Sequence, residues 1–283
     1  MNGSMVGKVC MVTGASSGIG KVTALELARM GATVVMVCRN QAKAEPVLAE
    51  IRQVTGNSAV ELMLADMSSQ ASIRALASAF KQKHDRLHVL VNNAGAIMFE
   101  RKLTVDGMES TFATNHLGGF LLTNLLLDEL KAAAPARVVG VSSGAHPFGH
   151  IDFDDLQGER KWSVWRAYSD SKLANVLFTA ELARRLAGRG VTANCLHPGI
   201  VRSNIVGNSP LVRGLIKLFG WIAVTPEQGA ETSIYLASSP EVEGISGEYF
   251  IRKKVARMSR EAADPAVARR LWEVSEKLTG LKQ

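Results

Sequence analysis

The sequence predicts a single α/β domain in which a parallel sheet lies between two layers of helices. Short β-branched apolar runs alternate along the chain with longer segments whose apolar residues recur every three or four positions. That alternation is typical of buried parallel strands joined by amphipathic helices. A glycine-rich turn also follows the first apolar run, as in the doubly wound, Rossmann-type sheets that bind nucleotides. No linker or change of composition divides the 283 residues, so we expect one domain over residues 1–283.

Six apolar runs are expected to be strands. They are Val9–Thr13, Thr33–Cys38, Val60–Leu64, Val89–Asn92, Arg137–Ser142 and Thr192–Leu196. The helices that matter most for function are expected from about Lys21, from about Thr104 to Lys131, over Trp165–Leu186 and over about residues 265–279. Because ligands of such sheets bind outside the carboxyl ends of the strands, functional residues are expected just after each strand or on the helix that follows.

Composition narrows the class of protein. With 47% hydrophobic and 21% charged residues, the chain is neither disordered, nor a collagen, nor a coiled coil. Three scattered cysteines, Cys10, Cys38 and Cys195, are too few for a disulfide framework or a four-cysteine zinc site. They favour a reducing compartment, so we expect a cytoplasmic protein. No apolar stretch reaches the ~18 residues of a membrane-spanning helix.

The net charge of +7 favours an anionic partner: a polyphosphate cofactor, an acidic lipid surface or nucleic acid. Nucleic acid is the least favoured, because the chain has no run of five Lys or Arg and none of the usual recognition motifs. A phosphate-bearing cofactor is favoured, because a suitable turn follows the first strand.

That turn has the spacing Gly-x-x-x-Gly-x-Gly, in which glycines let the backbone approach a pyrophosphate at a helix N-terminus. The residues expected to contact the cofactor here are Thr13, Gly14, Ser16, Ser17, Gly18, Ile19 and Gly20. A Walker loop is excluded, because Ala15 replaces its first glycine and Val22 its Ser/Thr. A plain tight connection between strand and helix is the alternative.

The second strand ends in Arg39 and Asn40, about twenty residues beyond the turn. A free ribose 2′-hydroxyl favours an acidic residue at this position, whereas a 2′-phosphate favours arginine. Arg39 can give a phosphate two charge-assisted hydrogen bonds. The sequence therefore predicts NADP(H) rather than NAD(H).

Tyr168 and Lys172 are four residues apart and share one face of a predicted helix. A cation about 4 Å from a phenol contributes up to ~4 kcal/mol toward its anion, about three pKa units before desolvation subtracts. Lys172 is therefore expected to make Tyr168 a usable acid and base. An ordinary exposed Tyr–Lys pair is the alternative.

Polar residues after two further strands support a site near this pair. Ser142 and Ser143 end the fifth strand, where a hydroxyl can hydrogen-bond a carbonyl or alcohol oxygen. Asn92–Gly95 ends the fourth strand, with small residues where a flat cofactor could approach. Asn115 lies in the helix after it, where its amide could hold a water near Lys172.

Taken together, these motifs resemble the short-chain dehydrogenase/reductase family over about Lys8 to Phe250. The matching segments are Thr13–Gly20, Asn92–Gly95, Asn115, Ser143, Tyr168-x-x-x-Lys172 and Pro198-Gly199. Within the family, Asn115–Gly118, His197–Gly199 and Ala268–Trp272 are similar to the retinol dehydrogenase-like branch.

The resemblance implies an oxidoreductase that transfers a hydride between NADP(H) and a carbonyl or alcohol. It implies that Tyr168 is the acid and base, that Lys172 holds the nicotinamide ribose, and that Ser143 positions the substrate oxygen, with Ser142 as the fallback. It implies that Asn115 maintains a water relay. The cofactor contacts that it adds are Asp66, Met67, Asn92, Ala94, Gly95, Pro198, Gly199, Val201 and Ser203, together with Tyr168 and Lys172. It also makes a helix-mediated homo-oligomer plausible.

Two segments outside these motifs also have a composition that bears on function. The connection from Ser143 to Tyr168 contains two histidines and three aspartates, but its spacing fits neither a zinc nor a calcium site, so no metal is expected. Residues 211–224 are strongly apolar, and in the family the region of about 203–225 covers the substrate. This favours a lipophilic aldehyde, ketone or retinoid-like substrate. A peripheral membrane contact through 211–224, or core packing, is also compatible.

Three other functions are alternatives to hydride transfer to a carbonyl. The first is reduction of a carbon–carbon double bond with NADPH, and the second is a sensor or scaffold that binds NADP(H) without turnover. The presence of Asn115, Ser143, Tyr168 and Lys172 argues against the sensor. The third, a basic nucleic-acid binder, is supported only by charge.

Overall fold

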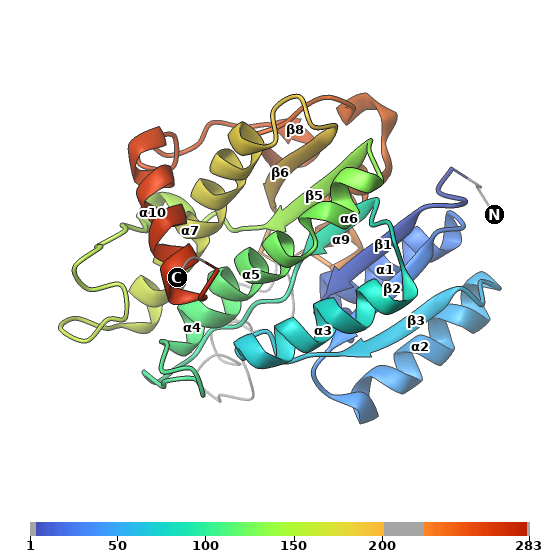
Figure 1. Cartoon of the computed structure of the whole chain (residues 1–283), viewed down its shortest axis with the longest axis horizontal. Coiled ribbons are helices and arrows are strands. Elements are labelled where there is room, and N and C mark those ends of the chain that lie inside the picture. Colours follow the sequence, from blue (N-terminus) through green and yellow to red (C-terminus); the bar gives the residue numbers. More distant parts are fainter. Residues whose placement is uncertain (1–3, 201–223, 282–283) are drawn as a thin grey trace.

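The computed structural model of the chain describes residues 4–200 and 224–281. An eight-stranded sheet runs through the molecule in the order β3-β2-β1-β4-β5-β6-β7-β8 (Figure 1). Seven strands are parallel, and β8 pairs antiparallel with β7 at one edge. The predicted class, a doubly wound α/β domain, is confirmed.

The strands agree closely with the predicted runs. They are β1 Val9–Thr13, β2 Thr33–Cys38, β3 Val60–Leu64, β4 Val89–Asn92, β5 Ala136–Val141, β6 Val191–His197, β7 Tyr249–Ile251 and β8 Lys254–Val255. The sequence analysis did not predict β7 and β8. They are too short to show an apolar period, and a tight turn with positive φ at Arg252 and Lys253 joins them.

Helices cover both faces of the sheet. On one face lie α1 Gly18–Arg29, α2 Gln41–Thr55 and α9 Pro226–Ser238; on the other lie α3 Gln70–Lys83, α5 Gly118–Leu125, α6 Leu127–Ala132 and α7 Val164–Arg185. The last helix, α10 Pro265–Leu278, packs outside α7 (Figure 1). Short helical turns are α4 Ser110–Phe112, η1 Ala113–Leu117, η2 His146–Phe148 and η4 Pro240–Val242.

Alternating residues of the central strands face the two helical layers. In β1 and β2, Met11 and Val35 pack into the core beneath α3 and α5, whereas Cys10 and Val34 pack beneath α1 and α2. Both sets are fully buried. The strands are therefore apolar on both faces, which explains why they are visible in the sequence as continuous apolar runs.

The expected helix from Thr104 to Lys131 was wrong at its start. Residues 101–109 form a turn with Gly107 at positive φ, closed by a bridge between Leu103 and Glu109. The helix begins only at Ser110, where the Glu109 carboxylate accepts the Phe112 N–H and caps it. It then widens into the π-helical turn η1 and is interrupted again at Leu126, between α5 and α6. Likewise, α1 begins at Gly18 rather than at Lys21.

Two predicted features lie wholly or partly outside the described residues. The proposed lid of about 203–225 and the apolar segment 211–224 fall in 201–223, apart from their last residues.

The predicted C-terminal helix of about 265–279 corresponds to α10. Within residues 4–200 and 224–281, no helix is both long and apolar enough to cross a bilayer.

Candidate active site

The turn after β1 is shaped for close approach of a phosphate. Gly14 and Gly18 have φ values of 68° and 55°, which favour glycine. A Cβ atom at Gly20 would lie 2.4 Å from both the Asn93 Nδ2 and the Gly14 carbonyl oxygen. Only glycine fits there, so the first turn of α1 presses directly against the ends of β1 and β4.

The N-terminus of α1 offers donors to an anion. Ser17 is its N-cap residue, yet its hydroxyl makes no capping hydrogen bond, and the first turn of this fully described helix has no acidic residue. The backbone N–H groups and the Ser17 hydroxyl can therefore face a pyrophosphate. Ser16 instead contacts the Cys38 thiol, and Ile19 packs against α9.

Hydrogen bonds join this turn to the end of β4. The Thr13 hydroxyl donates to the Val91 carbonyl and accepts the N–H groups of Asn93 and Ala94, both at 3.0 Å. The Asn93 amide in turn donates to the Thr13 carbonyl at 2.7 Å. Sequence reasoning had noted Asn93 only as part of Asn92–Gly95. Its position directly after a central strand was the signal available.

Just after β2, Arg39 stands beside Asp66. Its Nη1 lies 3.8 Å from the Asp66 Oδ2, and its side chain is 72% exposed. Because the pair is exposed, the guanidinium remains free to turn toward a phosphate. Asn40 caps α2 by accepting the Lys43 N–H, and Met67 is buried, with its carbonyl against Gly118.

The end of β4 leads to the catalytic candidates. A Cβ atom at Gly95 would lie 3.3 Å from the Asn115 Oδ1 and 3.4 Å from the Lys172 Nζ, so the missing side chain leaves room for both groups. Ala94 is half-buried between Asn93 and Gly95. The Asn92 amide donates to the Thr123 hydroxyl on α5, so this side chain holds the strand end to the helix layer.

Asn115 lies in the middle of η1, and its side-chain amide is held on three sides. Its Oδ1 accepts the Ala96 N–H at 2.7 Å, and its Nδ2 donates to the Ala96 carbonyl and to the Ser171 hydroxyl. Asn115 therefore joins the chain after β4 to α7, at the residue that precedes Lys172.

Lys172 is buried among these groups. Its Nζ donates to the Val141 carbonyl at 3.1 Å, and burial lowers its pKa from 10.5 to about 8. The Ser142 hydroxyl donates to the Lys172 carbonyl at 2.7 Å. Ser142 thus fixes α7 against β5, and its hydroxyl is already engaged.

Ser143 is the serine that faces Tyr168, to which it is hydrogen-bonded. The Ser143 hydroxyl also accepts the Ala145 N–H at 3.1 Å. Its carbonyl accepts the Tyr249 hydroxyl at 3.2 Å and lies 3.0 Å from the His146 Nδ1. Tyr249 and His146 were not singled out as supports of the serine, because only the fold brings β7 to this point.

The expected lowering of the Tyr168 pKa is not found in the chain alone. Burial raises the pKa of Tyr168, and the hydrogen bond with Ser143 offsets only part of this effect. The Lys172 Nζ lies 5.7 Å from the centre of the Tyr168 ring, and no hydrogen bond between the ammonium and the phenol is found among the described residues. Lowering this pKa therefore requires a further positive charge, such as an oxidised nicotinamide.

The end of β6 lies beside the end of β5. His197 accepts the Gly144 N–H at 2.9 Å through Nδ1, so its side chain supports the chain that follows Ser143. Pro198 and Gly199 follow it, and Gly199 has a φ of 88°. Val201 and Ser203, predicted cofactor contacts, lie outside the described residues.

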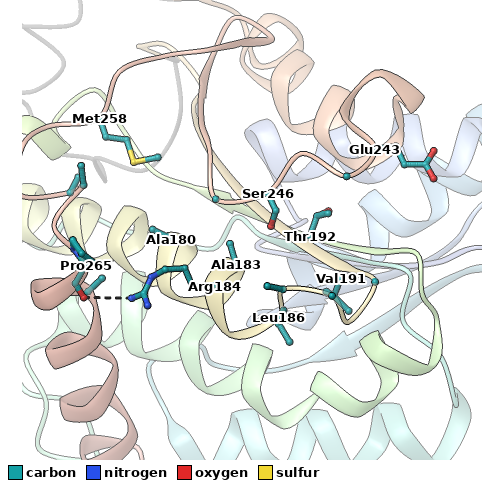
Figure 2. A pocket seen from close by; sticks show the side chains of 18 of the residues that line it. Ala180, Ala183, Arg184, Leu186, Val191, Thr192, Glu243, Ser246, Met258 and Pro265 are labelled. Carbon is teal, nitrogen blue, oxygen red and sulfur yellow. Dashed lines mark hydrogen bonds between the residues drawn. The ribbon is translucent and has the colours of Figure 1, made fainter.

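Neither a metal centre nor the cavity in the described residues involves the predicted site. Over the described part of the chain, no group of three His, Cys, Asp or Glu side chains could hold a metal ion. A cavity of about 840 Å³ lies near the amino end of β6, between α7, α10 and residues 243–247 (Figure 2). It contains none of the predicted site residues, which gather at the carboxyl ends of the strands.

Comparison with known families agrees with this arrangement. The family described as short chain dehydrogenase matches residues 8–211. The human protein named retinol dehydrogenase 11 is 50% identical over 275 residues, covering 97% of this chain and 86% of its own length. Human retinol dehydrogenase 14 is 47% identical and covers 99% of this chain and 88% of its own length.

Solved structures have the same fold. A crystal structure of an uncharacterised protein from Mycobacterium paratuberculosis has a TM-score of 0.79 and 38% identity, covering 97% of this chain and 94% of its own. A structure described as the Pseudomonas aeruginosa RhlG/NADP active-site complex has a TM-score of 0.72 and 25% identity, covering 95% of this chain and 99% of its own.

Proposed function

Because the chain belongs to the short-chain dehydrogenase family and is an oxidoreductase, we propose that it transfers a hydride between NADP(H) and a lipophilic aldehyde, ketone or alcohol. One observation carries the proposal. Tyr168 and Lys172 lie one turn apart on α7, and Tyr168 is hydrogen-bonded to Ser143 at the end of β5. A proton donor and an oxygen-binding hydroxyl therefore meet at the edge of the sheet where a cofactor can bind.

The described residues at the carboxyl ends of β1, β2 and β4 fit a nucleotide cofactor. Gly14, Gly18 and Gly20 shape a turn against which the pyrophosphate can lie, and the uncapped Ser17 offers it a hydroxyl. Arg39 supports NADP(H) over NAD(H), because it can turn from Asp66 to a 2′-phosphate. The Pseudomonas relative whose structure is described as an NADP complex is consistent with this preference.

When bound, NADP(H) supplies or accepts the hydride. During reduction, Tyr168 donates its hydroxyl proton to the substrate oxygen, which Ser143 holds in place by a hydrogen bond. Lys172 would hold the nicotinamide ribose of the bound cofactor through its ammonium. The buried ammonium favours the tyrosinate that remains after proton transfer, and Asn115 holds α7 in register beside it.

A lipophilic substrate is supported by the surface beside Tyr168. Trp165 precedes it by one turn on α7, and Phe148 follows Ser143 in η2. The two rings lie 6.0 Å apart and are 58% and 70% exposed. Such an exposed aromatic pair, close in the chain to Tyr168 and Ser143, suits an apolar substrate chain. Relatives named as retinol dehydrogenases support a retinoid-like alcohol or aldehyde as one such substrate.

The test is a cofactor and substrate panel. Purified protein is mixed with NADPH or NADH and a series of aldehydes and ketones, and oxidation of the cofactor is followed together with the product. An alcohol product formed faster with NADPH supports the proposal. A saturated carbonyl product from an unsaturated one would instead establish a double-bond reductase. NADPH binding without turnover of any carbonyl would favour the non-catalytic sensor.

A further inference from the structure

His116 and Ser275 are far apart in the chain but meet in the folded protein. The His116 Nε2 lies 2.9 Å from the Ser275 hydroxyl, and both side chains are almost completely buried. His116 belongs to η1, immediately after Asn115, and Ser275 belongs to α10. The contact therefore joins the C-terminal helix to the turn that carries a candidate catalytic residue.

An aromatic cluster surrounds the His116 ring. The rings of Phe112, Phe120 and Phe178 lie 5.1, 6.0 and 6.1 Å from it. Trp272 of α10 packs against Phe120 and Phe178. In this apolar setting burial lowers the pKa of His116 to about 3, so the imidazole is neutral and has one donor and one acceptor.

A buried polar contact in such a cluster does little for stability. Since folding exchanges hydrogen bonds with water for internal ones, an apolar pair of similar shape could replace His116 and Ser275 at little cost in stability. A hydrogen bond does, however, constrain direction in a way that apolar packing does not. The contact is therefore better suited to orienting η1 than to holding the fold together.

The turn has a reason to need orienting. In η1 the Gly118 N–H donates to the Ala113 carbonyl, five residues back, instead of the four of an α-helix. A π-helical turn contains one extra residue and can slip into α-helical register. Successive helical residues point about 100° apart. Holding the His116 side chain toward α10 thus fixes the direction in which Asn115 points toward Ala96 and Ser171.

We propose that His116, held by Ser275, is a positioning residue through which α10 sets the orientation of Asn115 and thereby of Lys172. This inference rests on the proposed function, which places Asn115 and Lys172 at the reacting groups. It also gives the C-terminal helix a part in catalysis, although the helix packs on the outer side of α7.

The experiment compares full-length variants with NADPH and nonanal. Ser275→Ala and the double variant His116→Phe/Ser275→Ala should lower kcat about 3- to 10-fold, the effect of one misplaced hydrogen bond. The KM for NADPH should stay close to wild type in both variants, and the thermal midpoint should stay close to wild type in the double variant. Ser275→Ala alone leaves the buried imidazole without this partner and should lower the thermal midpoint. The single variant His116→Gln, in which Ser275 is unchanged, keeps a hydrogen-bonding group within reach of the serine. It should retain most of the wild-type kcat. Glu273→Ala, at an exposed position on the same helix, is the matched control.

Wild-type kcat in the double variant would show that the contact only fills space and would overturn the inference. A parallel loss of kcat and thermal stability in the double variant would overturn it equally, and so would a kcat of His116→Gln as low as that of the double variant. If the wild-type protein turned over neither nonanal nor any other carbonyl, the proposed function would fail first, and the inference would fall with it.

Discussion

The Lys172 ammonium lies 5.7 Å from the centre of the Tyr168 ring and donates its hydrogen bond to the Val141 carbonyl. The two side chains share one face of α7, yet no hydrogen bond joins the ammonium to the phenol in the described structure. Lys172 therefore acts on Tyr168 only through space, and its charge does not offset the effect of burial on the Tyr168 pKa. The charge of a bound oxidised nicotinamide would have to supply the remainder.

Tyr168→Phe should reduce kcat by at least about 100-fold, because the group that exchanges a proton with the substrate oxygen is lost. NADPH binding, measured by fluorescence titration, should remain close to wild type, since the ring is kept. Tyr235→Phe is the control, because Tyr235 on α9 hydrogen-bonds Glu241 away from the site. Turnover by Tyr168→Phe within a few-fold of wild type would remove this residue from the role of acid and base.

Lys172→Met should stabilise the cofactor-free protein while abolishing turnover. Burial lowers the pKa of Lys172 from 10.5 to about 8. Near pH 7 the buried lysine is still protonated, and its desolvated charge destabilises the folded state. Removing the charge should raise the free energy of unfolding by about 1–3 kcal/mol at pH 7. Urea unfolding measures the change, with the exposed Lys277→Met as control.

The sign of its pH dependence follows from the same shift. Between pH 8 and 10.5 the unfolded chain still holds the Lys172 proton that the folded chain has released, so this residue's contribution to stability rises with pH. The advantage of Lys172→Met should be complete below about pH 8 and shrink toward pH 10.5. An advantage that grew with pH would contradict a buried lysine of lowered pKa.

The six parallel strands β1 to β6 were predictable because they are short runs of mainly apolar residues, most of which are buried in the sheet. Arg39, Ser143, Tyr168 and Lys172 could be chosen because they follow strands or share a helix face. The supports of the site could not be chosen in this way. Tyr249 reaches Ser143 from the short strand β7, and His116 reaches Ser275 across the outermost helix contact. Neither pairing leaves a periodic signal in the sequence.

The break in the expected helix after Thr104 has a local cause. Thr104 accepts hydrogen bonds from the N–H groups of Asp106 and Met108, and Gly107 adopts positive φ, so a turn competes successfully with the helix. The π-helical turn at Asn115 depends on contacts to Ala96, Ser171 and α10. Such an insertion is specified by tertiary contacts and not by the residues within it.

Arg39→Asp should reverse the cofactor preference. The change removes the cation available to a 2′-phosphate and places a carboxylate near Asp66, so kcat/KM for NADPH should fall by about 10- to 100-fold. Use of NADH should improve. Arg86→Asp makes the same change of net charge at an exposed position just before β4, at the amino ends of the strands. It should leave the ratio of kcat/KM for NADPH to that for NADH unchanged.

Steady-state kinetics with both cofactors decides the matter. If Arg39→Asp keeps the wild-type ratio of NADPH to NADH, another cation must recognise the phosphate. Lys21 or Lys43 would then be the next candidate. Lys21 is already paired with Glu50 at 2.7 Å, so it would first have to leave that carboxylate.

Trp165→Ala should make the enzyme less able to distinguish long from short substrates. The Trp165 and Phe148 rings are exposed beside Tyr168, and covering one such ring with an apolar chain is worth about 1.5–3 kcal/mol. The KM for all-trans-retinaldehyde or another long aldehyde should therefore rise roughly tenfold, whereas that for propanal should not change. Val54→Ala, at a 56% exposed apolar position on α2, controls for general loss of surface hydrophobicity. Equal changes for both aldehydes would mean that the aromatic pair does not bind the substrate chain. Loss of binding to lipid vesicles with unchanged kinetics would assign the pair to a membrane contact instead.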